Sequence, residues 1–280
     1  MTDTILITGT SSGYGRATAQ LFLDHGWNVI AAMRRPDPAV FAPSPRLKLV
    51  AMDVTRPESI DEAISEGLDA FGAIDVLVNN AGIGLASAVE VTPDATIREV
   101  FETNTFGTMA TCRAIIPQMR RQGRGVIINV TSSTGFGPMP LVAVYAASKT
   151  AVEGFTESLS YELHGFGITA RLVEPGLAPT TNFGQNAGTR MQGMIPPHYQ
   201  AYAAAYFARM SDYPTPYCSE TEVAEAVLAA ATDEGRRIRY PAGADSRMLA
   251  ELRHETSEAH YLARMREMFD PATYAPETLA

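Results

Sequence analysis

The chain has 280 residues, of which 46% are hydrophobic, and this length and content suit one α/β domain with a sizeable core. Its formal net charge of −9 argues against binding to nucleic acid or to an anionic membrane, because both need a basic surface. No apolar run approaches the ~20 residues that a membrane span needs, and the N-terminus enters a strand without a signal or transit peptide. We therefore expect a cytoplasmic protein.

Cysteine and histidine usage argues against disulfides and metals. The chain has only two cysteines, Cys112 and Cys218, which we expect to be reduced and structural in the absence of a secretory context. The five histidines form no ligand cluster, and the G-x-S-x-G turn of many hydrolases is absent. We therefore expect neither a metal site nor a hydrolase of that type.

Strand-like and helical segments alternate along the chain, which specifies a parallel sheet covered by helices on both faces. We expect a doubly wound Rossmann fold in one domain, residues 1–280. The expected strands lie at 3–8, 27–33, 47–52, 74–79, 124–131, 167–173 and 236–241, and the expected helices near 13–25, 58–71, 94–120, 145–164 and 219–233.

The first strand runs into a glycine-rich turn, Gly9 to Gly15, and then into a helix. Strand, glycine-rich turn and helix form the context that a phosphate-binding loop requires, because glycine lets a pyrophosphate approach the N–H groups at the positive helix end. The alternatives are an ordinary glycine-rich connection or the related loop of a nucleotide-dependent methyltransferase. The residues of this turn that we expect to contact a bound cofactor are Gly9, Ser11, Ser12, Gly13, Tyr14 and Gly15.

Three later segments carry further polar groups. Asn79-Asn80-Ala81-Gly82 ends one strand, and the strand at 124–131 runs into the hydroxyl of Ser132. Tyr145 and Lys149 follow, four residues apart and therefore on one face of the helix. A neighbouring ammonium lowers the pKa of a phenol, which would let Tyr145 donate and accept a proton near pH 7. Taken alone, this spacing also fits an ordinary solvated helix face.

In this order the segments resemble the classical short-chain dehydrogenase/reductase family, over roughly residues 3–245. The resemblance implies the strand order 3-2-1-4-5-6-7 and a homodimer or homotetramer formed through the helices at 94–120 and 145–164. The chain departs from the family pattern at Tyr14, which could alter the phosphate pocket, and at Pro179. The matching positions are Gly9, Gly13, Gly15, Asn79 to Gly82, Asn104, Ser132, Tyr145, Lys149, Pro175, Gly176 and Thr180.

The resemblance assigns catalytic roles to four residues. Tyr145 would exchange a proton with the substrate oxygen, and Ser132 would hydrogen-bond the same oxygen. Lys149 would hold the nicotinamide ribose and lower the pKa of the phenol, and Asn104 would bind a water that links Lys149 to solvent. Two alternatives stay open: Ser133 competes with Ser132, although the thirteen-residue offset to Tyr145 selects Ser132, and Asn104 alone could mark a helix kink or cap.

The second strand bears on cofactor choice. Met33 stands where an acidic residue would accept hydrogen bonds from an NAD ribose, and Arg34 follows, suited to a 2′-phosphate. NADP(H) is therefore favoured and NAD(H) remains possible, because Arg34 could also belong to a solvated turn. The resemblance adds Asp53 against the adenine and Thr180 against the carboxamide. The remaining expected cofactor contacts are Val54, Asn80, Ala81, Gly82, Tyr145, Lys149, Pro175 and Gly176.

Two segments remain outside the alternating pattern. An insertion at about 177–217 is rich in Tyr and Met, with a helix expected at 201–210, and a tail at about 245–280 includes an amphipathic helix over 245–269. A capping box formed by Ser219 and Glu222 should start the helix after the insertion. The insertion could be a lid over an apolar substrate, or its side chains could pack on the body or a partner subunit.

These observations predict an NADP(H)-dependent oxidoreductase that interconverts a ketone or aldehyde with an alcohol. The segment between Ser132 and Tyr145 favours a lipophilic or aromatic substrate, because it carries the apolar residues Phe136, Met139 and Leu141 together with Gly135 and Pro140. One alternative is a regulator that senses NADP(H) without turnover, although such a protein would be expected to lose Tyr145 or Lys149. Another is an epimerase or dehydratase of nucleotide sugars, which the length and glycine spacing disfavour.

Overall fold

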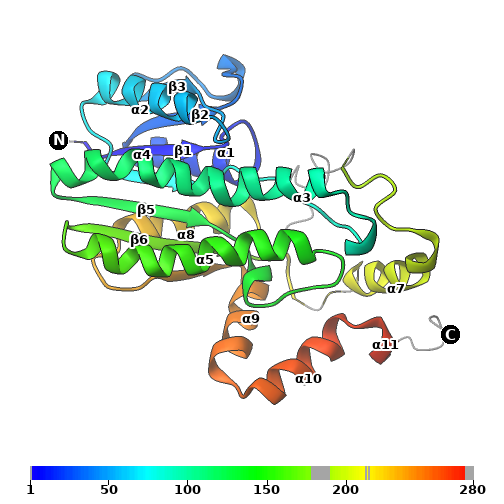
Figure 1. Ribbon diagram of the computed structural model, residues 1–280. Coiled ribbons are helices and arrows are strands. Elements are labelled where there is room, and N and C mark those ends of the chain that lie inside the picture. Colours follow the sequence, from blue (N-terminus) through cyan, green and yellow to red (C-terminus); the bar gives the residue numbers. More distant parts are fainter. Residues whose placement is uncertain (1, 178–189, 212, 214, 275–280) are drawn as a thin grey trace.

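The computed structural model describes residues 2–177, 190–211, 213 and 215–274 (Figure 1). Thr180 and Pro179 lie outside these residues, as does part of the predicted insertion and the end of the tail. Seven parallel strands form one sheet in the order β3-β2-β1-β4-β5-β6-β7, which confirms the predicted fold class. The strands are β1 (Thr4–Thr8), β2 (Asn28–Met33), β3 (Leu47–Ala51), β4 (Val76–Asn79), β5 (Gly125–Val130), β6 (Ile168–Pro175) and β7 (Arg239–Ala242).

Helices cover both faces of the sheet because the central strands are apolar on both sides. In β1, Ile5 and Ile7 face one cluster and Leu6 faces the other, as the alternation of side chains along a strand requires. The first cluster lies under α1 (Gly13–Asp24) and α8 (Glu220–Thr232). The second lies under α2 (Pro57–Phe71), α4 (Gly107–Gln122) and α5 (Ala143–His164).

The predicted helix at 94–120 is continuous but contains a distorted turn. It consists of α3 (Asp94–Phe101), a π-helical turn (Glu102–Phe106) and then α4. The π turn contains Asn104, so the structure shows the local helix distortion that the sequence left open at this residue. Such turns widen a helix by one residue and are frequent at functional sites.

The tail corrects a prediction. The single amphipathic helix expected over 245–269 is two helices, α9 (Ala244–Glu255) and α10 (Glu258–Phe269), followed by α11 (Pro271–Tyr274). The break has a local cause: the Ser257 hydroxyl accepts a hydrogen bond from the N–H of His260, which starts a new helix. The predicted helix at 201–210 is confirmed as α7 (Gln200–Ser211), and the Ser219–Glu222 capping box starts α8.

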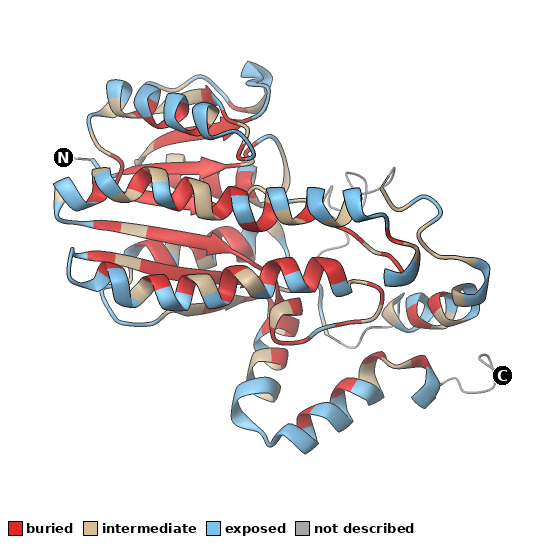
Figure 2. Cartoon of the chain, in the orientation of Figure 1, coloured by how far each residue is buried: buried red, intermediate tan, exposed pale blue. Residues whose placement is uncertain are grey.

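The tail and the described part of the insertion lie beyond the carboxyl ends of the strands, where α7, α10 and α11 gather (Figure 1). They form a third apolar cluster around the segment that follows β5. Tyr261 on α10 anchors it by donating a hydrogen bond to the carbonyl of Phe136 at 2.9 Å. The buried faces of these helices point toward this segment (Figure 2). The buried members of this third cluster include Phe136, Met139, Leu141, Tyr206, Leu249, Tyr261, Met265 and Phe269.

Candidate active site

The glycine-rich turn and the Asn80-Ala81-Gly82 segment form one structure at the end of β1. The Thr8 hydroxyl accepts the N–H of Asn80 at 3.0 Å and of Ala81 at 2.9 Å, and the Asn80 amide donates to the Thr8 carbonyl at 2.8 Å. Gly9 has a φ of +73°, and a Cβ there would lie 2.9 Å from the Ala81 Cα. The close approach of the turn to Ala81 therefore requires glycine at position 9. Sequence reasoning missed Thr8, although a hydroxyl at the last strand position was its signal.

The start of α1 fits an anion. Ser12 occupies the N-cap position without a side-chain cap hydrogen bond, and the first turn holds no acidic residue. The positive helix end therefore has no anionic side chain of its own to compete with a phosphate. A Cβ on Gly13 would meet open space, so glycine is required there by its φ of +57° and not by close contacts. Ser11, in the same turn, is exposed. This arrangement fits the pyrophosphate of a dinucleotide.

The ends of β2 and β3 carry the predicted adenosine contacts. Arg34 is exposed, while Asp53 accepts the N–H and hydroxyl of Thr55 at 3.0 and 2.7 Å. Burial acts to raise the pKa of Asp53, but the Thr55 hydrogen bonds and the charges of Arg34 and Arg56 outweigh it and lower that pKa. Arg34 and Arg56 therefore both lie within electrostatic reach of Asp53, and Arg56 was not predicted. Val54 is buried beside Asp53.

Ser132 and Tyr145 meet beyond the end of β5. Ser132 caps a short 3-10 helix (Ser133–Gly135) by accepting the N–H of Thr134 at 3.2 Å, and its side chain also hydrogen-bonds Tyr145 in the first turn of α5. Burial raises the pKa of Tyr145 to about 12, and the Ser132 hydrogen bond acts in the opposite direction. The phenol pKa therefore lies above its ordinary value, whereas the sequence predicted a lowered one.

Lys149 lies one turn further along α5 and is also buried. Its ammonium donates a hydrogen bond to the Val130 carbonyl at 3.0 Å. Burial lowers the pKa of Lys149 to about 8, and the charge of Glu153 opposes that shift. The pKa of Tyr145 is therefore raised and not lowered as predicted, because desolvation has the largest effect on the pKa of both Tyr145 and Lys149. The placement of Tyr145 and Lys149 on one helix face is confirmed.

Asn104 connects the segment after Gly82 to α5. Its side-chain oxygen accepts the N–H of Ile83 at 2.8 Å, and its amide donates to the Ile83 carbonyl at 2.9 Å and to the Ser148 hydroxyl at 3.1 Å. Ser148 in turn donates to the Tyr145 carbonyl at 2.7 Å. The side chain of Asn104 therefore holds the loop against the helix that carries Tyr145. The predicted water relay through Asn104 stays a prediction.

Pro175 and Gly176 lie at the end of β6, at the same edge of the sheet. The Gly176 N–H donates to the Ala242 carbonyl at 2.9 Å, and the Leu177 N–H donates to the carboxylate of Asp245 at 2.6 Å. The Asp245 carboxylate occupies the space that a Cβ on Gly176 would need, so only glycine fits there. Asp245, which lies in the first turn of α9, was not among the predicted residues.

Tyr14 is half-buried among the apolar residues under α1 and α8. Burial raises its pKa, and Cys218, Tyr145 and Asp245 add to the effect, so its hydroxyl lies within electrostatic reach of these groups. The tyrosine that departs from the family pattern at this position therefore lies on the side of the glycine-rich turn that faces Tyr145. Cys112 and Cys218 are both free and buried.

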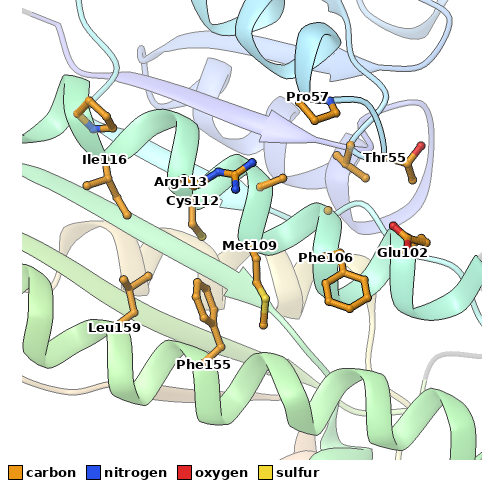
Figure 3. A pocket seen from close by; sticks show the side chains of 14 residues that line it. Thr55, Pro57, Glu102, Phe106, Met109, Cys112, Arg113, Ile116, Phe155 and Leu159 are labelled. Atoms are coloured by element: carbon orange, nitrogen blue, oxygen red, sulfur yellow. The ribbon is translucent and has the colours of Figure 1, made fainter. Parts of the chain in front are cut away.

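An apolar groove of about 570 Å³ lies elsewhere, between α4 and α5 (Figure 3). None of the four predicted catalytic residues lines it. Phe106, Met109 and Ile116 line one wall and Phe155 and Leu159 the other. This groove is therefore separate from the cluster around Ser132 and Tyr145.

Within the described residues, His, Cys, Asp and Glu form no group that could hold a metal ion. No helix in that part of the chain is both long and apolar enough to cross a membrane.

Comparison with known proteins decides the family. The family model described as short chain dehydrogenase matches residues 3–191, which contain the glycine-rich turn, Ser132, Tyr145 and Lys149. The chain belongs to the classical short-chain dehydrogenase/reductase family. It is 39% identical to 3-ketodihydrosphingosine reductase of Bacteroides thetaiotaomicron over 172 residues, which cover 61% of this chain and 62% of that reductase.

Solved structures of this family share the whole fold. A short-chain dehydrogenase/reductase from Burkholderia phymatum in complex with NAD superposes with a TM-score of 0.76 at 26% identity, covering 91% of this chain and 93% of that one. A short-chain dehydrogenase from Burkholderia cenocepacia in complex with NADP gives a TM-score of 0.73 at 26% identity, covering 94% and 97%. A nicotinamide cofactor is thus supported, and these relatives divide between NAD and NADP.

Proposed function

We propose that this short-chain dehydrogenase/reductase is an NADP(H)-preferring enzyme that interconverts a ketone or aldehyde with an alcohol, with Tyr145 as the acid and base. The observation that carries the proposal is the hydrogen-bonded pair of Ser132 and Tyr145, which is buried at the edge of the sheet that also holds the glycine-rich turn. Ligands of open α/β sheets bind at this edge. A pure sensor of NADP(H) would not require this pair.

The residues divide the work of carbonyl reduction. The nicotinamide, when bound, supplies or accepts the hydride. Tyr145, with a pKa of about 12, is protonated at neutral pH and ready to donate its proton to the substrate oxygen. The Ser132 hydroxyl stabilises negative charge on that oxygen. Lys149 would hold the ribose hydroxyls, and the first turn of α1 the pyrophosphate. A protonated Tyr145 is the form that carbonyl reduction uses, and its phenolate is the form that alcohol oxidation uses.

The proposed substrate is lipophilic or aromatic. Phe136, Met139 and Leu141 lie in the segment between Ser132 and Tyr145, and the helices α7 and α10 cover that segment with further apolar side chains. Apolar side chains around a binding site favour an apolar ligand. The relative named 3-ketodihydrosphingosine reductase supports this choice, because its name specifies a long-chain ketone.

Initial rates with NADPH and with NADH test the proposal. The panel should run from small aliphatic aldehydes to aryl, steroidal and long-chain ketones. We expect the highest kcat/KM with NADPH and a bulky apolar ketone. Measurable binding of NADPH without turnover on any member of the panel would instead favour the sensor.

Replacing Arg34 with Ala should weaken NADPH far more than NADH. A charge-assisted bond to the 2′-phosphate contributes about 1.5–3 kcal/mol, so the Kd for NADPH should rise roughly 10- to 100-fold. The Kd for NADH, which lacks that phosphate, should change little. Fluorescence titration of both cofactors measures this, with Arg35→Ala as the control because Arg35 is the next exposed arginine. Equal weakening of the two cofactors would contradict the preference for NADP(H).

We also propose that the groove between α4 and α5 is covered by a second copy of the chain. Phe106, which lines this groove, is 52% exposed. Phe106→Glu should place a charge in that interface and convert a homodimer or homotetramer into a smaller species, as light scattering would show. Phe166→Glu is the control, because Phe166 is 46% exposed and does not line the groove. An unchanged mass for Phe106→Glu would rule out this interface.

A further inference from the structure

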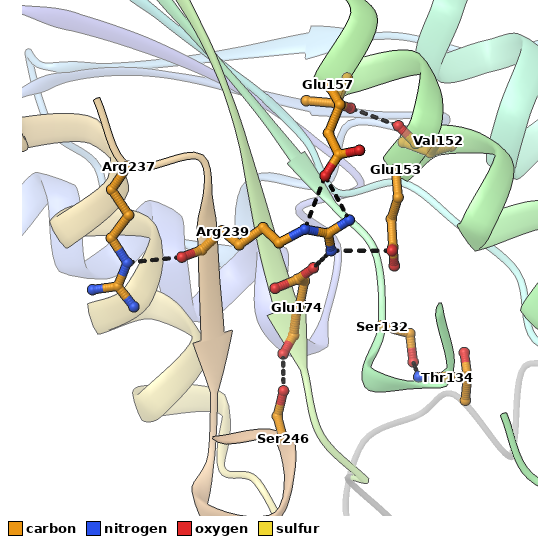
Figure 4. Close-up of polar contacts among 10 residues, drawn as sticks. Ser132, Thr134, Val152, Glu153, Glu157, Glu174, Arg237, Arg239 and Ser246 are labelled. Atoms are coloured by element: carbon orange, nitrogen blue, oxygen red, sulfur yellow. Dashed lines mark hydrogen bonds and ion pairs between the residues drawn. The ribbon is translucent and has the colours of Figure 1, made fainter. Parts of the chain in front are cut away.

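One partly buried arginine binds three carboxylates behind the candidate active site. Arg239, at the start of β7, lies 3.1 Å from Glu153 and 2.9 Å from Glu157, both on α5, and it also pairs with Glu174 on β6 (Figure 4). The same nitrogen, Nη1, binds both Glu153 and Glu174. These two carboxyl groups are therefore neighbours.

The three carboxylates differ in their access to water. Glu174 is fully buried and Glu153 is 4% exposed, whereas the Glu157 side chain is 48% exposed. Burial raises the pKa of both Glu153 and Glu174, and the charge of Arg239 opposes the shift at each. Two like charges beside one nitrogen in a desolvated site favour a proton on one of them.

Burial singles out Glu174 as the protonated group, because Glu174 is fully buried whereas Glu153 is 4% exposed. One oxygen of each carboxyl group, Glu174 Oε2 and Glu153 Oε1, is buried without a hydrogen-bond partner among the described residues. Leaving an oxygen of an ionised carboxylate unsatisfied costs more free energy than leaving one of a neutral acid. Glu153, by contrast, follows Lys149 by four residues on α5, so the two side chains share one helix face.

The charges around the cluster balance when Glu174 is neutral. Lys149 and Arg239 are the two cations, and Glu153 and Glu157 are then the two anions. Glu153 is the charged group that opposes the effect of burial on Lys149. Among the described residues, His254 on α9 also faces the cluster, and its pKa is lowered first by its burial and then by the charge of Arg239.

Glu153 also contacts the segment that carries Ser132. Its carboxyl group fills the space that a Cβ on Gly135 would need, in the short helix capped by Ser132. Glu174 directly precedes Pro175 and Gly176, and its carbonyl accepts the hydroxyl of Ser246 at 2.6 Å. The cluster therefore adjoins the three chain segments that bring Ser132, Lys149 and Gly176 to the edge of the sheet.

We propose that Glu153 is a positioning residue whose carboxylate keeps Lys149 charged, and that Glu174 remains a neutral acid beside Arg239 at neutral pH. The inference extends the proposed function, because it concerns the charge that Lys149 needs in order to act there. Neither residue is required to touch the substrate or the cofactor.

The chain allows a direct measurement, because Lys48 and Lys149 are its only lysines. In protein labelled with ¹³C at the lysine ε-carbons, NMR follows the titration of both ammonium groups without substrate or cofactor, and Lys48→Arg assigns the signals. Glu153→Gln should lower the midpoint of Lys149 by roughly one pH unit, the lower end of the effect of a nearby opposite charge. An unchanged midpoint would overturn the role of Glu153.

Two matched variants complete the test. Glu174→Gln should leave the Lys149 midpoint and the melting temperature close to those of the wild type, because glutamine resembles a neutral acid. A fall equal to that in Glu153→Gln would show that Glu174 is ionised and would overturn its assignment. Glu157→Gln removes the exposed partner of Arg239 and should also change little, since water screens its charge.

A more conservative variant guards against misfolding of Glu153→Gln. Glu153→Asp keeps the charge but withdraws it by one methylene, so the Lys149 midpoint should fall in the same direction by less. A midpoint at or above that of the wild type would contradict the proposal. Because the readout is the titration of Lys149, this result is independent of whether the substrate panel shows turnover.

Discussion

Tyr145→Phe should lower kcat for carbonyl reduction by about 10²- to 10⁴-fold, the usual contribution of a positioned general acid. The substitution removes only the hydroxyl that hydrogen-bonds Ser132 and leaves the ring in its buried place in α5. The Kd for NADPH should therefore change by less than about threefold, because the proposed cofactor contacts of Lys149 and of the glycine-rich turn are intact. Single-turnover kinetics and fluorescence titration measure the two quantities.

Tyr161→Phe provides the control for this experiment. Tyr161 lies on the same helix but is 82% exposed, so loss of its hydroxyl should leave both kcat and the Kd unchanged. If Tyr145→Phe kept more than about a tenth of the wild-type kcat, Tyr145 would not be the general acid, given the contribution such a group makes. A parallel loss of NADPH binding would point to a structural role for the hydroxyl instead.

The fold could be predicted because its signals are local. β1 is apolar on both faces and ends in a glycine-rich turn, and such a strand between helical segments specifies a buried parallel sheet. Tyr145 and Lys149 could be placed together because four residues span one helical turn. The break at Ser257 was missed because its apolar pattern continues through it, while a single hydroxyl decides where the helix starts again.

The electrostatics could not be predicted because they depend on burial. Spacing alone places an ammonium near the Tyr145 hydroxyl and suggests a lowered pKa, yet desolvation raises that pKa to about 12. The cluster around Arg239 could not be predicted either, because it too depends on which residues the fold brings together and buries. Glu153 and Glu174 lie on consecutive elements, but Arg239 comes from β7, 65 residues beyond Glu174, and no motif joins the three until the sheet assembles. Asp245 likewise becomes recognisable only beside Gly176.

Gly15→Ala should impair cofactor binding and folding together, because the new Cβ would overlap the carbonyl oxygen of Gly9 and the amide of Asn80. The Gly9 oxygen belongs to the backbone, so the turn itself must shift. Overpacking of this kind lowers the free energy of unfolding by about 1–3 kcal/mol. Loss of one or two backbone hydrogen bonds to a charged phosphate should raise the Kd for NADPH roughly 100-fold.

Gly154→Ala makes the same substitution where the structure leaves room. Gly154 lies in the middle of α5, and a Cβ there meets no atom within 4 Å. Alanine is favoured over glycine inside a helix, so this variant should raise the free energy of unfolding by about 0.5–1 kcal/mol and leave the Kd for NADPH unchanged. Denaturant unfolding and cofactor titration of both variants give the comparison. Gly15→Ala with wild-type affinity would show that the cofactor's phosphates do not depend on the close approach of this turn.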